Sequence, residues 1–303
     1  MNSDKMVADE TVVEKTSTPS KFKDYALLLK LRLAFLVVLS AISGYLFVGG
    51  AFDLNFVFLI IGGFLITGSS NGFNQIIERD LDKKMNRTSE RPIPSGRMSV
   101  NEAFIIAAVC GVVGAALLFQ INYFSGILGL LALVMYVFLY TPMKRVSPWA
   151  VFVGAFPGAI PPMLGVLAHT GTFEGEAGFT AGLLFFIQFI WQFPHFWAIA
   201  WVLDEDYAKG GFSLLPSRTR KSKRSAFYIL IYTLFMVPVS LLPWVMEMTS
   251  DTTLVVGTVA GAWFFVKAYQ LYLNLEDKAA KGLMFASFIY LPIIQFLYVF
   301  DKI

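Results

Sequence analysis

Charged residues are scarce in this chain, making up 15% of its 303 residues, whereas soluble domains carry about 25%. Cysteine is nearly missing as well: Cys110 is alone, which excludes an intramolecular disulfide and any cysteine cluster for zinc or iron–sulfur. Hydrophobic residues instead reach 56%, and 30 residues are phenylalanine. This composition excludes a disordered, fibrous or disulfide-stabilised chain and predicts an integral membrane protein.

Two common catalytic motifs are also missing from the sequence. It has no Gly-x-x-x-x-Gly-Lys-Ser/Thr, which excludes a P-loop ATPase, and no Gly-x-Ser-x-Gly nucleophile elbow. The net charge of +3 is too small to indicate a nucleic-acid partner, so we expect none. The lipid bilayer is the partner that the composition does predict.

Long apolar stretches recur along the chain without the period-two alternation of a β-barrel. Because about 20 apolar residues cross a bilayer as a helix, we predict an all-α fold of nine transmembrane helices. Their expected bounds are Lys30–Val48, Phe56–Ile77, Ala103–Phe119, Tyr123–Tyr140, Trp149–Ala168, Phe179–Leu203, Ser225–Val245, Thr252–Leu273 and Leu283–Phe300.

Lysine and arginine are lacking in every second loop, near Asp53, Asn122, Glu174 and Glu247, and gather in the alternate loops. The positive-inside rule therefore predicts a cytoplasmic N-terminus and, after nine crossings, an external C-terminus. Residues 1–24 are polar and lack the features of a signal or transit peptide. We expect a disordered cytoplasmic tail there, a membrane domain over residues 25–303, and a bacterial plasma membrane.

One polar cluster begins inside the second predicted span and continues past its end. Asn74, Glu78 and Asp82 are spaced i, i+4 and i+8, so a continuing helix would place three oxygen ligands on one face. Such ligands suit Mg²⁺ with substrate phosphates, and Arg87 and Arg91 are placed to hold phosphate oxygens. A solvated, topology-setting loop is the alternative, but it does not explain a polar Asn74 inside a span.

A similar acidic cluster follows the sixth span and contains Asp204 and Asp206, with Lys209 beside them. This weak repeat predicts two four-helix units plus a ninth helix, with both clusters at one mouth of the bundle. A helix end with ordinary loop charges is the alternative. Lys144 and Arg145 close the fourth span at the same side, where diphosphate binding and simple anchoring are equally good explanations.

The sixth span carries polar residues within the bilayer. Gln188, Gln192 and His195 share one helix face, and Pro194 withdraws a backbone donor beside them. A histidine inside a membrane indicates an iron ligand, a proton carrier or a hydrogen bond to a substrate. A hydrogen bond between helices is the structural alternative.

These segments resemble the UbiA superfamily of intramembrane prenyltransferases, whose first acidic motif is similar to the stretch around Asn74, Glu78 and Asp82. Within the superfamily the resemblance is greatest to the members that farnesylate haem. Three segments carry it: residues 82–92 (DKKMNRTSERP), residues 140–145 (YTPMKR) with 158–165 (GAIPPMLG), and residues 192–198 (QFPHFWA).

The resemblance implies a UbiA-type bundle with a central cavity open near the cytoplasmic face. It further implies transfer from farnesyl diphosphate to haem b, giving haem O for terminal oxidase assembly, with haem A synthase or oxidase assembly factors as further partners. Asn74, Glu78 and Asp82 would hold Mg²⁺ and diphosphate, and His195 would contact haem. The remaining implied residues are the cations Arg87, Arg91, Lys144, Arg145 and Lys209 and the second-motif acids Asp204 and Asp206.

The sequence departs from the superfamily in two places. Glu78 stands where an aspartate is usual, and the second cluster lacks the usual spaced aspartate pair. Two other functions stay open at this point: the same chemistry on an aromatic acid or quinone precursor, and a carrier for lipid diphosphates or haem. Transport fits less well, because transporters usually bind near the bilayer midplane rather than at one mouth.

Overall fold

The structure, a computed structural model, describes residues 20–303, and every regular element among these is a helix, apart from an isolated bridge between Thr249 and Lys302. Residues 1–19 of the predicted tail lie outside the described range, and residues 21–24 form the start of the first helix. In order the elements are α1 (Lys21–Leu29), α2 (Leu31–Phe47), α3 (Leu54–Asp82), α4 (Val100–Ile121), α5 (Tyr123–Val134), the π-helix η1 (Met135–Tyr140), α6 (Thr141–Met143), α7 (Ala150–Thr170), α8 (Gly175–Val202), α9 (Asp204–Lys209), α10 (Lys223–Ser240), α11 (Leu242–Val245), α12 (Asp251–Asn274) and α13 (Asp277–Asp301).

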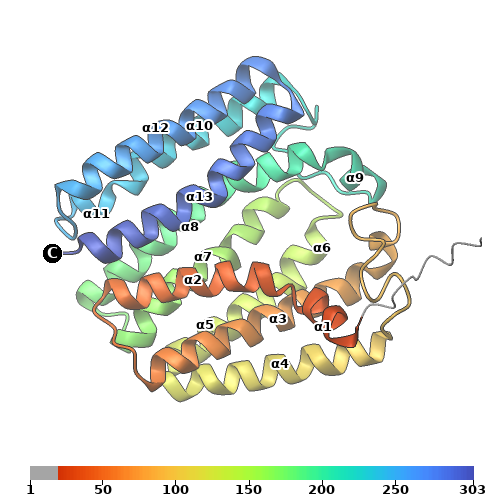
Figure 1. The fold of residues 1–303 in the computed structure, drawn as a ribbon, viewed down its shortest axis with the longest axis horizontal. Coiled ribbons are helices and arrows are strands. Elements are labelled where there is room, and N and C mark those ends of the chain that lie inside the picture. The colour runs from red at the N-terminus through yellow and green to blue at the C-terminus, as the bar shows by residue number, and fades with distance from the viewer. Residues whose placement is uncertain (1–19) are drawn as a thin grey trace, which may run out of the picture.

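Eight helices in this range are long and apolar enough to cross a membrane, and α1 with α2, bent by 45°, forms a ninth candidate. The predicted all-α membrane fold is therefore confirmed. In Figure 1, α10 and α12 lie on one side of the bundle and α3, α4 and α5 on the other, with α2, α7, α8 and α13 between them. The small helices α1, α6 and α9 gather at one end of the bundle, and the C-terminus lies at the other.

Small residues allow the central helices to pack with their backbones in contact, as is common between membrane helices. A Cβ atom added to Gly165 of α7 would lie 1.9 Å from the carbonyl oxygen of Ala41 in α2. One added to Gly44 of α2 would lie 2.0 Å from the carbonyl oxygen of Pro162. The α2–α7 contact thus depends on two glycines that face backbone atoms.

We expect Gly165→Ala to lower stability by about 1–3 kcal/mol, because its new methyl group would push α2 away from α7. Gly182→Ala is the matched control, since a Cβ there meets no atom of the described residues within 4 Å and alanine favours a helix. Thermal unfolding of both variants in detergent measures the difference. Equal unfolding midpoints would show that the helices are not in backbone contact.

Candidate active site

Helix α3 continues past the predicted span to Asp82, so the three predicted ligands occupy successive turns of one face. The exposed fractions of Asn74, Glu78 and Asp82 are 2%, 4% and 0%. Three polar side chains at the end of a membrane helix are therefore enclosed by protein. Their burial requires partners, since an unpaired buried carboxylate is costly.

Each carboxylate has a cation beside it. Lys144 Nζ lies 2.5 Å from Glu78 Oε1, and Arg91 Nη1 lies 2.6 Å from Asp82 Oδ2. Burial lowers the pKa of Lys144 from its usual value, and the neighbouring Glu78 carboxylate opposes that shift. Two of the predicted diphosphate-binding cations thus contact two of the predicted metal ligands.

The π-helix η1 directs Lys144 into the site. Pro142 has no N–H, and the Thr141 backbone N–H donates to the Tyr136 carbonyl five residues earlier, which widens the helix at this point. Asn74 Nδ2 donates to Thr141 Oγ1 at 3.1 Å and ties α3 to the widened turn. The turn that follows presents Lys144 to Glu78, with its Nζ 4.9 Å from the centre of the Tyr140 ring.

The second acidic cluster divides between two partners. The Asp206 carboxylate accepts hydrogen bonds from the backbone N–H groups of Asn86 at 2.7 Å and Arg87 at 3.2 Å. It therefore supports the loop of the first cluster. Asp204 instead lies 2.9 Å from Arg220 Nη2 and contacts the segment before α10. The structure brings Asp206 to the first cluster and directs the Asp204 carboxylate to another partner.

Two predicted cations stand at the edge of the cluster. Lys209 Nζ lies 3.7 Å from Asp206 Oδ1, and its side chain is about half exposed. Arg145 is exposed and lines a groove of about 410 Å³ that reaches Glu78. Apolar residues form most of the other groove wall, namely Ile77, Leu81, Pro142 and Val146.

Lys30, which the sequence analysis names only as the start of the first predicted span, lies close to the charged cluster. It lies between α1 and α2 in a left-handed conformation, with φ 48° and ψ 56°, and within electrostatic reach of Glu78, Arg87, Arg91 and Lys144. Amides of α3 hold this bend: Gln75 Nε2 donates to the Leu28 carbonyl at 2.7 Å, and Asn71 Nδ2 to that of Leu29 at 3.3 Å. The sequence does give one sign of this position, because Lys30 stands between the apolar residues Leu29 and Leu31.

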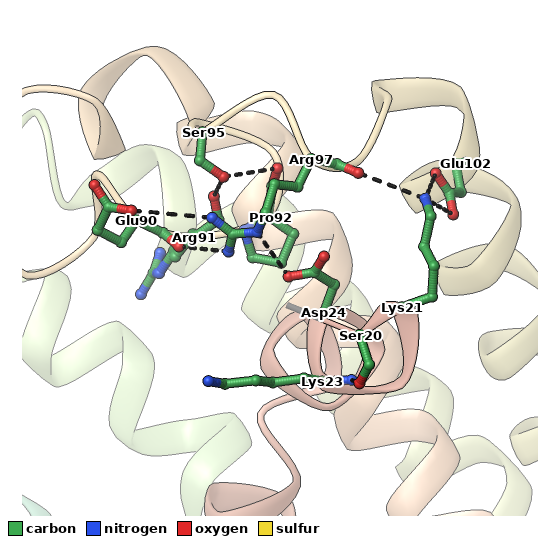
Figure 2. Close-up of polar contacts among 10 residues, drawn as sticks. All are labelled: Ser20, Lys21, Lys23, Asp24, Glu90, Arg91, Pro92, Ser95, Arg97 and Glu102. Atoms are coloured by element: carbon green, nitrogen blue, oxygen red, sulfur yellow. Dashed lines mark hydrogen bonds and ion pairs between the residues drawn. The ribbon is translucent and has the colours of Figure 1, made fainter. Parts of the chain in front are cut away.

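Arg97 joins α1 to the loop that carries Arg91 (Figure 2). Its Nε donates to the buried Asp24 carboxylate at 3.0 Å, and its Nη2 donates to the Glu90 carbonyl at 2.8 Å. Lys21 of α1 also forms an ion pair with Glu102 of α4, but that pair is exposed. The buried contact is the stronger constraint on the loop.

Deeper in the bundle, the glutamines of α8 satisfy backbone groups of α7. Pro162 cannot donate to the Gly158 carbonyl four residues earlier, and Gln188 Nε2 donates to that carbonyl at 2.7 Å instead. Gln192 Nε2 donates to the Ala155 carbonyl at 2.9 Å. These two side chains hold the helices together, while His195 contacts α13 through Ser287.

The donor set of the first cluster suits a hard cation. Asp82 Oδ1 is buried without a hydrogen-bond partner among residues 20–303, and Asn74 and Glu78 supply further oxygens on the same face. In the described part of the chain, no three Asp, Glu, His or Cys side chains come together as a metal cluster. Glu78 and Asp82 could hold such an ion together with a phosphate ligand.

The fold and the charged site define a membrane enzyme of the prenyltransferase class: residues 36–291 match the UbiA prenyltransferase family, and the chain belongs to that family. Solved UbiA structures share the fold. A digeranylgeranylglyceryl phosphate synthase structure superposes with a TM-score of 0.75 at 19% identity, covering 92% of this chain and 98% of that one. A UbiA homolog from Archaeoglobus fulgidus bound to GPP and Mg²⁺ gives 0.64 at 15% identity, covering 91% and 99%.

Relatives of higher sequence identity point to one group within the family. The chain is 48% identical to the protoheme IX farnesyltransferase of Cytophaga hutchinsonii over 287 residues, which are 94% of this chain and 99% of that protein. It is 33% identical to the human mitochondrial protoheme IX farnesyltransferase over 300 residues, covering 96% of this chain and 66% of the human protein.

Arg97→Gln should speed amide exchange in α1 and in residues 83–99 by at least about tenfold, because it leaves the Asp24 carboxylate buried without its cation. Glu102→Gln removes only the exposed pair and should change exchange by no more than a few-fold. Hydrogen–deuterium exchange read by mass spectrometry compares the variants. Similar protection in both would show that Arg97 does not hold the loop.

Proposed function

We propose that this protein transfers the farnesyl group of farnesyl diphosphate to a vinyl group of haem b, giving haem O for terminal oxidase assembly. The observation that carries the proposal is the enclosed pair of contacts Glu78–Lys144 and Asp82–Arg91 at one end of the bundle. Near full-length similarity to relatives named protoheme IX farnesyltransferase supports haem as the acceptor.

The cluster holds its cations ready for a diphosphate. Lys144 and Arg91 are paired with carboxylates before substrate arrives, and a diphosphate offers them oxygens of higher charge. The carboxylate oxygens that this exchange frees, together with Asp82 Oδ1 and Asn74, would hold Mg²⁺. When bound, Mg²⁺ supplies neutralisation of the negative charge on the leaving group.

Ionisation of the donor then needs charge stabilisation rather than a strong base. The bond between C1 of the farnesyl group and the diphosphate oxygen breaks, and its electron pair leaves with the diphosphate, which Arg87, Arg91 and Lys144 hold. The aromatic faces of Tyr140 and Phe212 lie beside Lys144 and favour positive charge nearby. Vinyl π electrons form the new C–C bond, and water adds to the resulting cation with loss of one proton, leaving a hydroxyl.

The loops also support a location for the enzyme. The basic loops accompany the end of the bundle that holds the active site, so we place that end and the N-terminus in the cytoplasm of a bacterium. Asp301 and Lys302 then lie outside the plasma membrane. Haem A synthase or oxidase assembly factors are the partners expected to receive the product.

Incubation of the purified protein with haem b, farnesyl diphosphate and Mg²⁺ tests the proposal by mass spectrometry. We expect a haem that has gained one farnesyl group and one hydroxyl. A prenylated aromatic acid or quinone precursor, with haem unchanged, would replace haem as the acceptor. Flux of haem or lipid diphosphate into vesicles without any covalent product would instead indicate a carrier.

Asp82→Asn should lower turnover at least about a hundredfold, because the transition state loses a charged partner worth roughly 3 kcal/mol. Asp80→Asn is the matched control on the same helix, since the Asp80 side chain is 73% exposed. Removal of Mg²⁺ with a chelator should abolish the wild-type reaction, and added Mg²⁺ should restore it. Near-normal turnover of Asp82→Asn would contradict the ligand assignment.

Lys30→Gln should raise the KM for farnesyl diphosphate about tenfold or more, because it removes an amine that lies within electrostatic reach of Arg91 and Lys144. Arg32→Gln, an exposed position on α2, serves as the control. Steady-state kinetics with each substrate varied separately give the comparison. An unchanged KM for the diphosphate, or an equal rise for haem, would place Lys30 outside the donor site.

A further inference from the structure

His195 is held from three directions inside the membrane bundle. Its ring stacks on Trp191 with centroids 4.3 Å apart and planes 18° from parallel, and Phe288 approaches edge-on at 4.8 Å. Ser287 Oγ of α13 lies 2.7 Å from His195 Nδ1. The side chain is only 6% exposed, so its orientation is fixed by these neighbours.

The protons in this contact can be counted. A serine hydroxyl carries one proton, and Ser287 Oγ donates it to the Met284 carbonyl at 2.6 Å. Ser287 Oγ must therefore accept from His195, so the imidazole carries its proton on Nδ1. Nε2 then bears a free electron pair, and it has no hydrogen-bond partner among residues 20–303.

Trp191 strengthens the same arrangement. Its indole Nε1 donates to the Ser287 carbonyl at 3.1 Å while its ring supports the imidazole. One residue of α13 thus binds both the histidine and the tryptophan on which it stacks. Met284, Ser287 and Trp191 together fix the tautomer as well as the ring plane.

We propose that Ser287 is a positioning residue that presents His195 Nε2 as an axial ligand to the iron of a tetrapyrrole substrate. The inference rests on the proposed function, which supplies haem as that substrate. An iron ion accepts an electron pair, so only the tautomer protonated on Nδ1 can bind it through Nε2. Metal-binding histidines usually donate their other ring N–H to an oxygen, as His195 does here.

The position on α8 also suits this role. His195 lies nine residues before Asp204, which is about 13 Å along a helix at 1.5 Å per residue. An acceptor held by its iron at that depth sits in the apolar part of the bundle. Its vinyl groups lie on the rim of the ring, so the rim rather than the iron meets the farnesyl group.

Binding of ferrous haem b to the full-length protein in nanodiscs tests the proposal. The wild type should show the resonance Raman band of an iron–histidine bond, and His195→Ala should lose it until free imidazole is added. Ser287→Ala should shift the band to lower frequency and weaken haem binding about tenfold. Ser287→Thr, which keeps a hydroxyl, should restore both values.

Metal-free protoporphyrin IX separates ligation from packing. Its affinity should be the same for wild type and Ser287→Ala, because it has no iron to bind Nε2. Ser70→Ala is the matched control, since Ser70 also donates to a helix carbonyl but lies on α3. A serine variant that weakens both porphyrins equally would show a purely structural role and overturn the proposal.

The outcomes also distinguish this inference from the proposed function. If wild type makes farnesylated haem but His195→Ala binds haem with an unchanged iron spectrum, iron ligation by His195 is wrong and the transferase function stands. If the iron–histidine band depends on His195 but no farnesylated haem forms, the transferase proposal fails on its own.

Discussion

Two carboxylates are tolerated at the buried end of α3 because cations from other segments lie beside them. An isolated ion in such surroundings costs several kcal/mol, so Glu78 requires Lys144 and Asp82 requires Arg91. This requirement determines much of the surrounding structure. The π-helix η1 delivers one cation, and the loop after α3, fastened to α1 through Arg97, delivers the other.

The spans and the shared polar face of α3 could be predicted because helical periodicity is a local property of the sequence. The partners could not, because they come from distant segments. A lysine such as Lys30 at the basic side of a span is usually an anchor, and its sequence does not show that α1 bends there. Asp204 and Asp206 are two residues apart, yet only the structure shows that one contacts Arg220 and the other supports Arg87.

The two acidic clusters look equivalent in sequence but have different structural roles. The first provides buried charges that face a shared site, whereas the Asp206 carboxylate receives backbone N–H groups of the first loop. The second half of the chain thus supports the end of the bundle that holds the charged cluster and adds the deeper face that carries His195. A likeness in sequence between two halves is therefore compatible with a division of labour between them.

Buried polar groups deep in the bundle show how that deeper face is organised. Gln188 replaces the hydrogen bond that Pro162 cannot make, and its own Oε1 accepts from Gln295, which in turn accepts from Ser40. These amides satisfy one another because an unpaired polar group in a membrane is expensive. Within the described residues, His195 Nε2 lacks such a partner although the rest of its ring is fully restrained. A rigid ring that keeps one electron pair free is suited to bind an electron-pair acceptor, and the restraint itself lowers the entropy cost of doing so.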